Sequence, residues 1–102
     1  MRIGVFDSGV GGLTVAKALG ESGRFSEIIY LGDTARVPYG GRAPSTVVRY
    51  ALEAVEFFNA LSIELLVVAC NTVSVCALEE MRRQSRVPVY GVVEPGVLAV
   101  EK

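Results

Sequence analysis

Four short apolar runs, separated by segments with helical periodicity, constrain the fold of this chain more than any other feature. The runs are Ile3 to Phe6, Ile28 to Leu31, Leu65 to Ala69 and Val87 to Val93. They are continuously apolar, which is typical of strands that are covered on both faces, as in a parallel sheet. Helical patterns follow the first three runs, over Leu13 to Leu19, Thr46 to Leu61 and Val73 to Arg83. This alternation predicts an α/β fold: a doubly wound, flavodoxin-like, four-stranded parallel sheet flanked by helices, with strand order 2-1-3-4 and right-handed crossovers.

The apolar face of the middle helix is unusually wide. One stripe holds Val48, Leu52, Val55 and Phe58, and Tyr50, Ala54, Phe57 and Leu61 lie beside it. Two interpretations stay open: a helix fully buried in the core, or a helix of which part of the face meets another domain or subunit. Because the chain also ends in an apolar stretch, Val97 to Val100, we expect it to associate as a homo-oligomer.

Composition and charge exclude several classes of partner. The 102 residues suit one domain, with 51% hydrophobic and 21% charged residues. A net charge of −1 without a basic stripe argues against nucleic acid and against membrane surfaces. The strongest apolar run, Leu65 to Cys70, is far shorter than the roughly 20 residues of a membrane span. Asp7 and Ser8 interrupt the apolar start, so we expect no secretory signal.

The two cysteines, Cys70 and Cys76, match neither a redox CxxC motif nor a zinc pattern. We therefore expect reduced thiols, a cytoplasmic protein and no metal.

Polar and reactive groups follow all four predicted strands. They are Asp7-Ser8-Gly9-Val10-Gly11-Gly12, then Gly32-Asp33-Thr34 with Pro38-Tyr39-Gly40, then Cys70-Asn71-Thr72, and finally Glu94-Pro95-Gly96. Ligands of doubly wound sheets bind beyond the carboxyl ends of the strands, so these residues are candidates for a site.

The glycine-rich turn after the first strand resembles a phosphate cradle only superficially. It lacks the Lys-Ser/Thr ending of a P-loop, it is not GxGxxG, and it opens with a carboxylate that repels phosphate. Two interpretations remain: a purely structural tight turn, or a cradle for a small carboxylate ligand held by the amides of Ser8 and Gly9.

Cys70 is the most informative of these residues. It stands at a strand end and opens a helix, where the amide dipoles favour a thiolate able to act as a base. The alternative, a buried core cysteine, applies better to Cys76, which falls inside the predicted helix. The chain has no histidine, which excludes a Cys-His dyad within these residues.

Asp7 and Cys70 end strands that the predicted order makes neighbours, so they are expected to converge on one ligand. A carboxylate there attracts a substrate ammonium or assists proton movement, but it also opposes the thiolate by like-charge repulsion. Asp7 is equally suited to capping its own loop, because aspartate is common in tight turns.

The segments IGVFDSGVGGLTV, YLGDTARVPYG, VVACNTVS and VYGVVEPGV together resemble the successive signatures of glutamate racemases, within the aspartate/glutamate racemase group. The resemblance covers essentially the whole chain. It implies interconversion of L- and D-glutamate without pyridoxal phosphate or metal, supplying D-glutamate for peptidoglycan. It also implies that Cys70, with Asp7, is catalytic, and that the substrate is contacted by Asp7, Ser8, Tyr39, Gly40, Asn71 and Thr72.

The resemblance further implies that residues 1–102 form the first domain of a two-domain enzyme. The second base then belongs to a Cys-Thr-His segment of a second domain, and both that domain and a C-terminal return segment are absent from this sequence. We therefore expect the 102 residues alone to be inactive. Two alternatives stay open: an aspartate or hydantoin racemase, and a non-catalytic amino-acid-binding or scaffold domain.

Overall fold

A four-stranded parallel sheet organises the computed structural model, which describes residues 1–9 and 11–91. The elements in chain order are β1 (Arg2–Asp7), α1 (Leu13–Glu21), β2 (Glu27–Gly32), the 3-10 turn η1 (Thr34–Arg36), α2 (Pro44–Asn59), β3 (Leu65–Val68), α3 (Asn71–Cys76), α4 (Leu78–Gln84) and β4 (Val89–Gly91). The strand order is β2-β1-β3-β4, with every pair parallel. The predicted fold class and strand order are confirmed.

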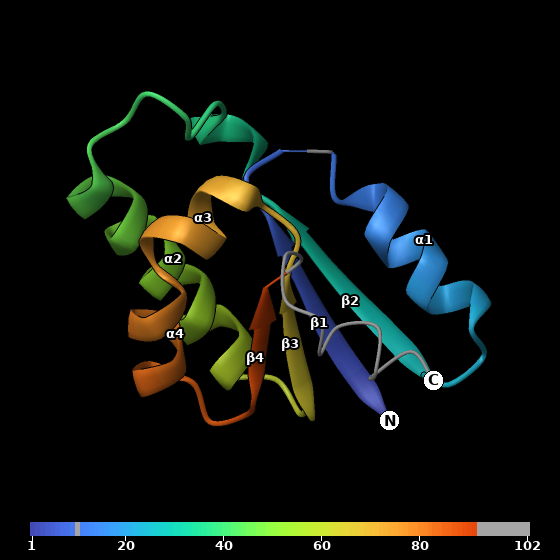
Figure 1. Cartoon of the computed structure of the whole chain (residues 1–102). Helices are drawn as coiled ribbons and strands as arrows, with labels where there is room; N and C mark the ends of the chain where they lie inside the picture. The colour runs from blue at the N-terminus through green and yellow to red at the C-terminus, as the bar shows by residue number, and fades with distance from the viewer. Residues whose placement is uncertain (10, 92–102) are drawn as a thin grey trace.

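Helices cover both faces of the sheet (Figure 1). α1 lies on one side of the sheet, and α2, α3 and α4 lie on the other. Successive residues of a strand point to opposite faces, so the core divides into two clusters. The α1 cluster contains Ile3, Val5, Leu19, Leu65 and Val67, whereas the larger cluster includes Phe6, Leu66, Val68 and Val89 with the inward side chains of α2. This double coverage explains why the strands are continuously apolar.

α2 is amphipathic, not buried all round. Its buried residues are alternately three and one positions apart, which places them on one face of the helix. They are Val47, Tyr50, Ala51, Ala54, Val55 and Phe58. Val48 and Leu52 are only half-buried, and Phe57 is 45% exposed. The prediction of a fully buried helix is therefore wrong for the outer face. Contact of that face with another domain or subunit stays a prediction.

The predicted third helix, from Val73 to Arg83, is two helices. α3 and α4 meet at Ala77, whose φ of −134° departs from helical geometry. Ala77 is buried together with Val73 and Met81, and the hydrogen bonds Ala77 N to Val73 O and Met81 N to Ala77 O continue through the break. Packing of both short helices against the core produces this bend, because neither glycine nor proline marks it in the sequence.

The fourth strand is shorter than predicted within the described residues. β4 spans Val89–Gly91, whereas the prediction ran from Val87 to Val93. Val92 and Val93, the predicted site segment Glu94-Pro95-Gly96 and the apolar stretch Val97 to Val100 all lie outside the described residues. Within residues 1–9 and 11–91, none of the helices has the length and apolar content that a bilayer crossing requires.

α2 packs closely on the sheet at Gly4 of β1. A Cβ atom at this position would lie 2.5 Å from the ring of Phe58 and 3.1 Å from Ile63. Phe58 is almost completely buried, so its ring has little room to retreat. The approach of helix to sheet therefore depends on glycine at position 4.

Gly4→Ala is expected to lower the free energy of unfolding by about 1–3 kcal/mol, because overpacking forces the ring or the helix to shift. The measurement is chemical denaturation followed by circular dichroism. Gly20→Ala is the control, since the nearest atom to a Cβ in this exposed part of α1 is Ile28 Cδ1, at 3.5 Å. Alanine there should raise stability by about 0.5–1 kcal/mol. Equal stability of Gly4→Ala and the unsubstituted chain would contradict the packing argument.

Candidate active site

Cys70 and Ser8 meet at the carboxyl ends of the two central strands. The Cys70 thiol donates a hydrogen bond to Ser8 Oγ across 3.2 Å. Cys70 lies two residues after the end of β3 and is the N-cap residue of α3, so it stands between a strand and a helix, as the sequence predicts. Its side chain is 7% exposed, while Ser8 is half-buried. The thiol thus lies just beneath the sheet edge, in contact with the hydroxyl of Ser8 from the loop after β1. Cys70 is buried and Cys76 only half-buried, so the expectation that Cys76 is the buried core cysteine is wrong.

Asp7 closes that loop through both oxygens of its carboxylate. Oδ1 accepts the Ser8 amide at 2.8 Å, and Oδ2 accepts the amide of Gly12, the N-cap residue of α1, at 2.6 Å. Asp7 is 5% exposed. The carboxylate therefore performs the loop-capping role considered from the sequence. Because the Ser8 amide is taken by Asp7, it is not available in this conformation to the carboxylate ligand that the sequence suggested for it.

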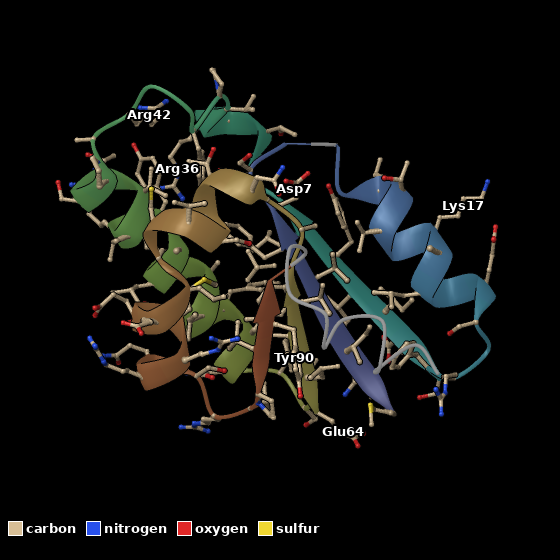
Figure 2. The ribbon with its side chains drawn as sticks, in the orientation of Figure 1. Asp7, Lys17, Arg36, Arg42, Glu64 and Tyr90 are labelled. Carbon is tan, nitrogen blue, oxygen red and sulfur yellow. The ribbon has the colours of Figure 1, made fainter. Side chains whose placement is uncertain are left out.

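Figure 2 labels Asp7 at the edge of the sheet where the strands end and α3 begins. The other predicted contact residues gather along the same edge. Gly40 and Asn71 are exposed, and Thr72 is half-buried. A Cβ atom on Gly40 would lie 3.9 Å from Thr72 Oγ1, so the loop before α2 adjoins the start of α3.

Tyr30 contributes to this site although the sequence analysis did not single it out. Its hydroxyl donates to the Gly9 carbonyl at 2.8 Å and lies 3.4 Å from Asp7 Oδ2. Burial, followed by the charge of Asp7 and the hydrogen bond to it, raises the pKa of Tyr30. In the sequence, Tyr30 is one of the four residues of the apolar run from Ile28 to Leu31. Its only distinguishing signal is a phenol hydroxyl that needs a partner near the sheet edge.

Tyr39 is placed differently from the other predicted contact residues. Its side chain is 1% exposed, and its ring packs against Phe6 and Tyr50, with centroids 6.4 and 5.4 Å away. Its hydroxyl donates to Asp33. Burial first, and then the hydrogen bond to Asp33, raise the pKa of Tyr39 above its ordinary value of 10.0. The Tyr39 side chain therefore anchors its loop, and the following residue, Gly40, is exposed.

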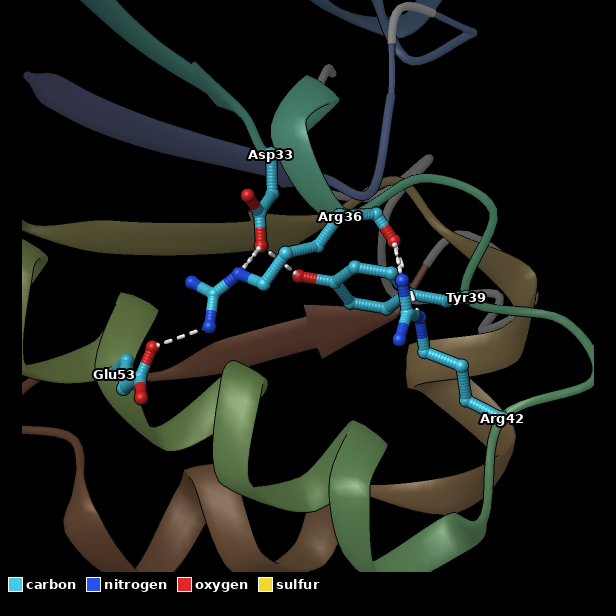
Figure 3. Close-up of polar contacts among 5 residues, drawn as sticks. All are labelled: Asp33, Arg36, Tyr39, Arg42 and Glu53. Atoms are coloured by element: carbon cyan, nitrogen blue, oxygen red, sulfur yellow. Dashed lines mark hydrogen bonds and ion pairs between the residues drawn. The ribbon is translucent and has the colours of Figure 1, made fainter.

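Arg36 extends this anchor to α2 (Figure 3). Its guanidinium bonds Asp33 Oδ2 at 2.8 Å and Glu53 Oε1 at 2.7 Å, and it lies 4.0 Å above the ring of Tyr50. Arg42 donates twice to the Arg36 carbonyl, at 2.9 and 3.2 Å. These contacts hold the segment between β2 and α2, which carries Gly40.

The described residues 1–9 and 11–91 contain no group of three or more His, Cys, Asp or Glu side chains placed to bind a metal. The polar groups at the sheet edge are instead a thiol, a hydroxyl, a loop-capping carboxylate and backbone amides. In this all-parallel α/β sheet they lie at the carboxyl edge of the strands, which is where proteins of this fold class bind their ligands.

Comparison with known proteins is specific. The chain is 60% identical over 101 residues to a glutamate racemase of Nitratiruptor sp. and 56% identical over 102 residues to one of Helicobacter pylori, covering 99% and 100% of this chain and 40% of each relative. The Campylobacter jejuni glutamate racemase structure superposes with a TM-score of 0.89 at 54% identity, covering 98% of this chain and 40% of that chain. No protein-family model matches. Over essentially its whole length the chain is therefore similar to glutamate racemases, and it spans about 40% of the length of these relatives.

Tyr39→Phe is expected to lower the free energy of unfolding by about 1–3 kcal/mol at neutral pH, because Asp33 loses a buried donor. The raised pKa of Tyr39 adds a pH signature. Above about pH 10 the unfolded tyrosine releases its proton while the folded one retains it, so this contribution to stability is lost as pH rises. The difference between the two proteins should therefore shrink in alkaline solution.

Denaturant unfolding from pH 7 to pH 11 measures this difference. Glu53→Gln is the control at the half-exposed end of the same network, and it should change stability by less than about 1 kcal/mol. A stability gap between Tyr39→Phe and the unsubstituted chain that widens with pH would refute the assignment of the buried proton.

Proposed function

We propose that the polypeptide carrying this chain interconverts L- and D-glutamate, with Cys70 as one of two acid/base groups. The observation that supports this proposal most directly is the hydrogen bond between Cys70 and Ser8, which follow neighbouring strands. The family supports the choice of substrate. The structure of the Francisella tularensis relative is a complex with D-glutamate, and that of the Thermus thermophilus relative contains β-chloro-D-alanine.

The proposed reaction removes the α-proton from one face of the α-carbon and adds a proton to the opposite face. The Cys70 thiolate takes the α-proton and becomes a thiol, while the electron pair of the broken C–H bond remains on the α-carbon beside the carboxylate group. A second group then donates a proton to the opposite face. Cys76 is not that group, because it lies at the far end of α3 from Cys70. The proposal assigns the second base to a part of the polypeptide outside these 102 residues, as the resemblance to glutamate racemases implies.

Ser8 supports the proposed role of Cys70 in either protonation state. Its Oγ accepts the thiol proton in the neutral state. After the proton leaves, the hydroxyl can rotate and donate to the sulfur. A hydrogen bond to a charged partner is roughly twice as strong as a neutral one, so this contact favours the thiolate.

Asp7 acts in this proposal through its negative charge. Two backbone amides compensate its charge, which reduces its repulsion of a thiolate and leaves a negative centre to attract the substrate ammonium. The amides and side chains of Asn71 and Thr72, with the backbone of Tyr39 and Gly40, form the neighbouring edge that receives the substrate carboxylates.

In the complete polypeptide, Cys70→Ser should lower kcat for glutamate racemisation by about 10²–10⁴-fold, because a hydroxyl is a far weaker acid than a thiol. Glutamate binding should persist, since the side chain keeps its approximate size. Circular dichroism of the reacting amino acid measures turnover, and Cys76→Ser is the matched control, expected to retain activity. Undiminished turnover by Cys70→Ser would rule out the proposed role.

The isolated 102 residues provide a separate test, because they carry only one of the two proposed bases. Incubated with L-glutamate in deuterium oxide, they should leave the optical rotation unchanged, although slow α-deuterium incorporation with retention is compatible with a lone base. Mass spectrometry and polarimetry follow the two quantities together. Sustained loss of rotation by the verified 102-residue species would mean that the second base is present within it.

A further inference from the structure

We propose that Tyr30 is a positioning residue: its hydroxyl fixes the loop after β1 so that Ser8 stabilises the thiolate form of Cys70. The catalytic meaning of this inference rests on the function proposed above. The physical coupling of Tyr30 to Cys70 does not, and it can be measured on the chain itself.

The first step is the placement of Tyr30 beside the loop. β2 pairs with β1 in parallel, with Tyr30 opposite Val5, so the long side chain reaches the residues that follow β1. Its hydroxyl donates to Gly9 O at 2.8 Å and approaches Asp7 Oδ2 to 3.4 Å. Because its pKa is raised, this hydroxyl remains a donor throughout the neutral range.

The second step is that the loop has little freedom around Ser8. On one side, the Asp7 carboxylate holds the amides of Ser8 and Gly12. After Ser8, the Gly9 carbonyl accepts the hydrogen bond from Tyr30. The same carbonyl lies so close to Gly32 that a Cβ atom on residue 32 would overlap its oxygen. Ser8 is therefore fixed from both neighbouring residues.

The third step is the contact that this restraint serves. Ser8 Oγ lies 3.2 Å from Cys70 Sγ. A hydrogen bond loses strength quickly with distance and misalignment. Release of Gly9 would let the backbone of Ser8 shift, and the Ser8 hydroxyl would no longer be placed to donate to the thiolate. The consequence is a smaller fraction of thiolate at a given pH.

The test is the pH dependence of Cys70 alkylation by iodoacetamide, read by peptide mass mapping, with Cys76 as the internal reference. The midpoint of the profile reports thiolate stability, whereas the plateau at high pH reports access to the sulfur. Tyr30→Phe should move the Cys70 midpoint to higher pH and lower its neutral-pH rate by about threefold to tenfold, the effect of losing one modest hydrogen bond. The Cys76 profile should not move.

A double-mutant cycle identifies the route. Ser8→Ala should shift the Cys70 midpoint in the same direction, and the Tyr30→Phe/Ser8→Ala double variant should match Ser8→Ala alone, because both changes act on one contact. Tyr90→Phe is the matched control. It removes the same hydroxyl from β4, at the same level of the sheet and in the same hydrophobic cluster, away from the Ser8–Gly9 loop.

An unshifted Cys70 midpoint in folded Tyr30→Phe, or additive shifts in the double variant, would overturn the inference. If Tyr30→Phe unfolds, Gly32→Ala is the second variant: its Cβ would overlap the Gly9 carbonyl and press on the Tyr30 hydroxyl, so it should produce the same shift. Racemase assays of the complete polypeptide separate the two proposals. A shifted profile in an inactive polypeptide rejects the function and keeps the coupling, whereas active enzyme with an unshifted profile does the reverse.

Discussion

Parallel pairing of β1 with both of its neighbours is the constraint on which the rest of the structure depends. The register joins Asp7 to Gly32 on one side and Phe6 to Val68 on the other, so the three strands end at one level. The residues that follow these strands therefore lie close together. They are the loop after β1, the turn after β2 and Cys70 after β3. Each strand supplies one part of the candidate site, and the hydrophobic core beneath supports all three.

The groups at this edge divide into those proposed to meet a ligand and those that hold the others in place. Cys70 and Ser8 form the hydrogen-bonded pair on which the proposal rests, and Gly40 and Thr72 line the neighbouring edge. Asp7 takes backbone amides and closes its own loop, and the phenol of Tyr39 is buried against Asp33. These two side chains therefore hold their own loops in place, and the substrate contacts expected for Asp7 and Tyr39 stay predictions. A side chain that is already hydrogen-bonded in this way needs no reorganisation when a ligand binds.

Some helical detail was beyond sequence reasoning because it depends on neighbours in space. Periodicity identifies the segment from residue 73 to residue 83 as helical, but the break at Ala77 follows from the fit of two short helices against the core. The width of the apolar face of α2 is also visible in the sequence. Which residues of that face are buried is decided by how the helix packs on the sheet, where Phe58 lies close against Gly4.

The sequence by itself determined the fold class and the strand order, because hydrophobic periodicity and the order of motifs are local properties of the chain. It also placed Cys70 at a strand end, where its chemical role stays a prediction. Tertiary structure alone decided the partners of those residues. Tyr30, 40 positions before Cys70, reaches the site because β2 and β3 flank the same strand. Asp7 turns inward because two amides are placed to receive it. Hydrogen-bond partners depend on ångström-scale distances between segments far apart in the chain, and a one-dimensional pattern does not contain them.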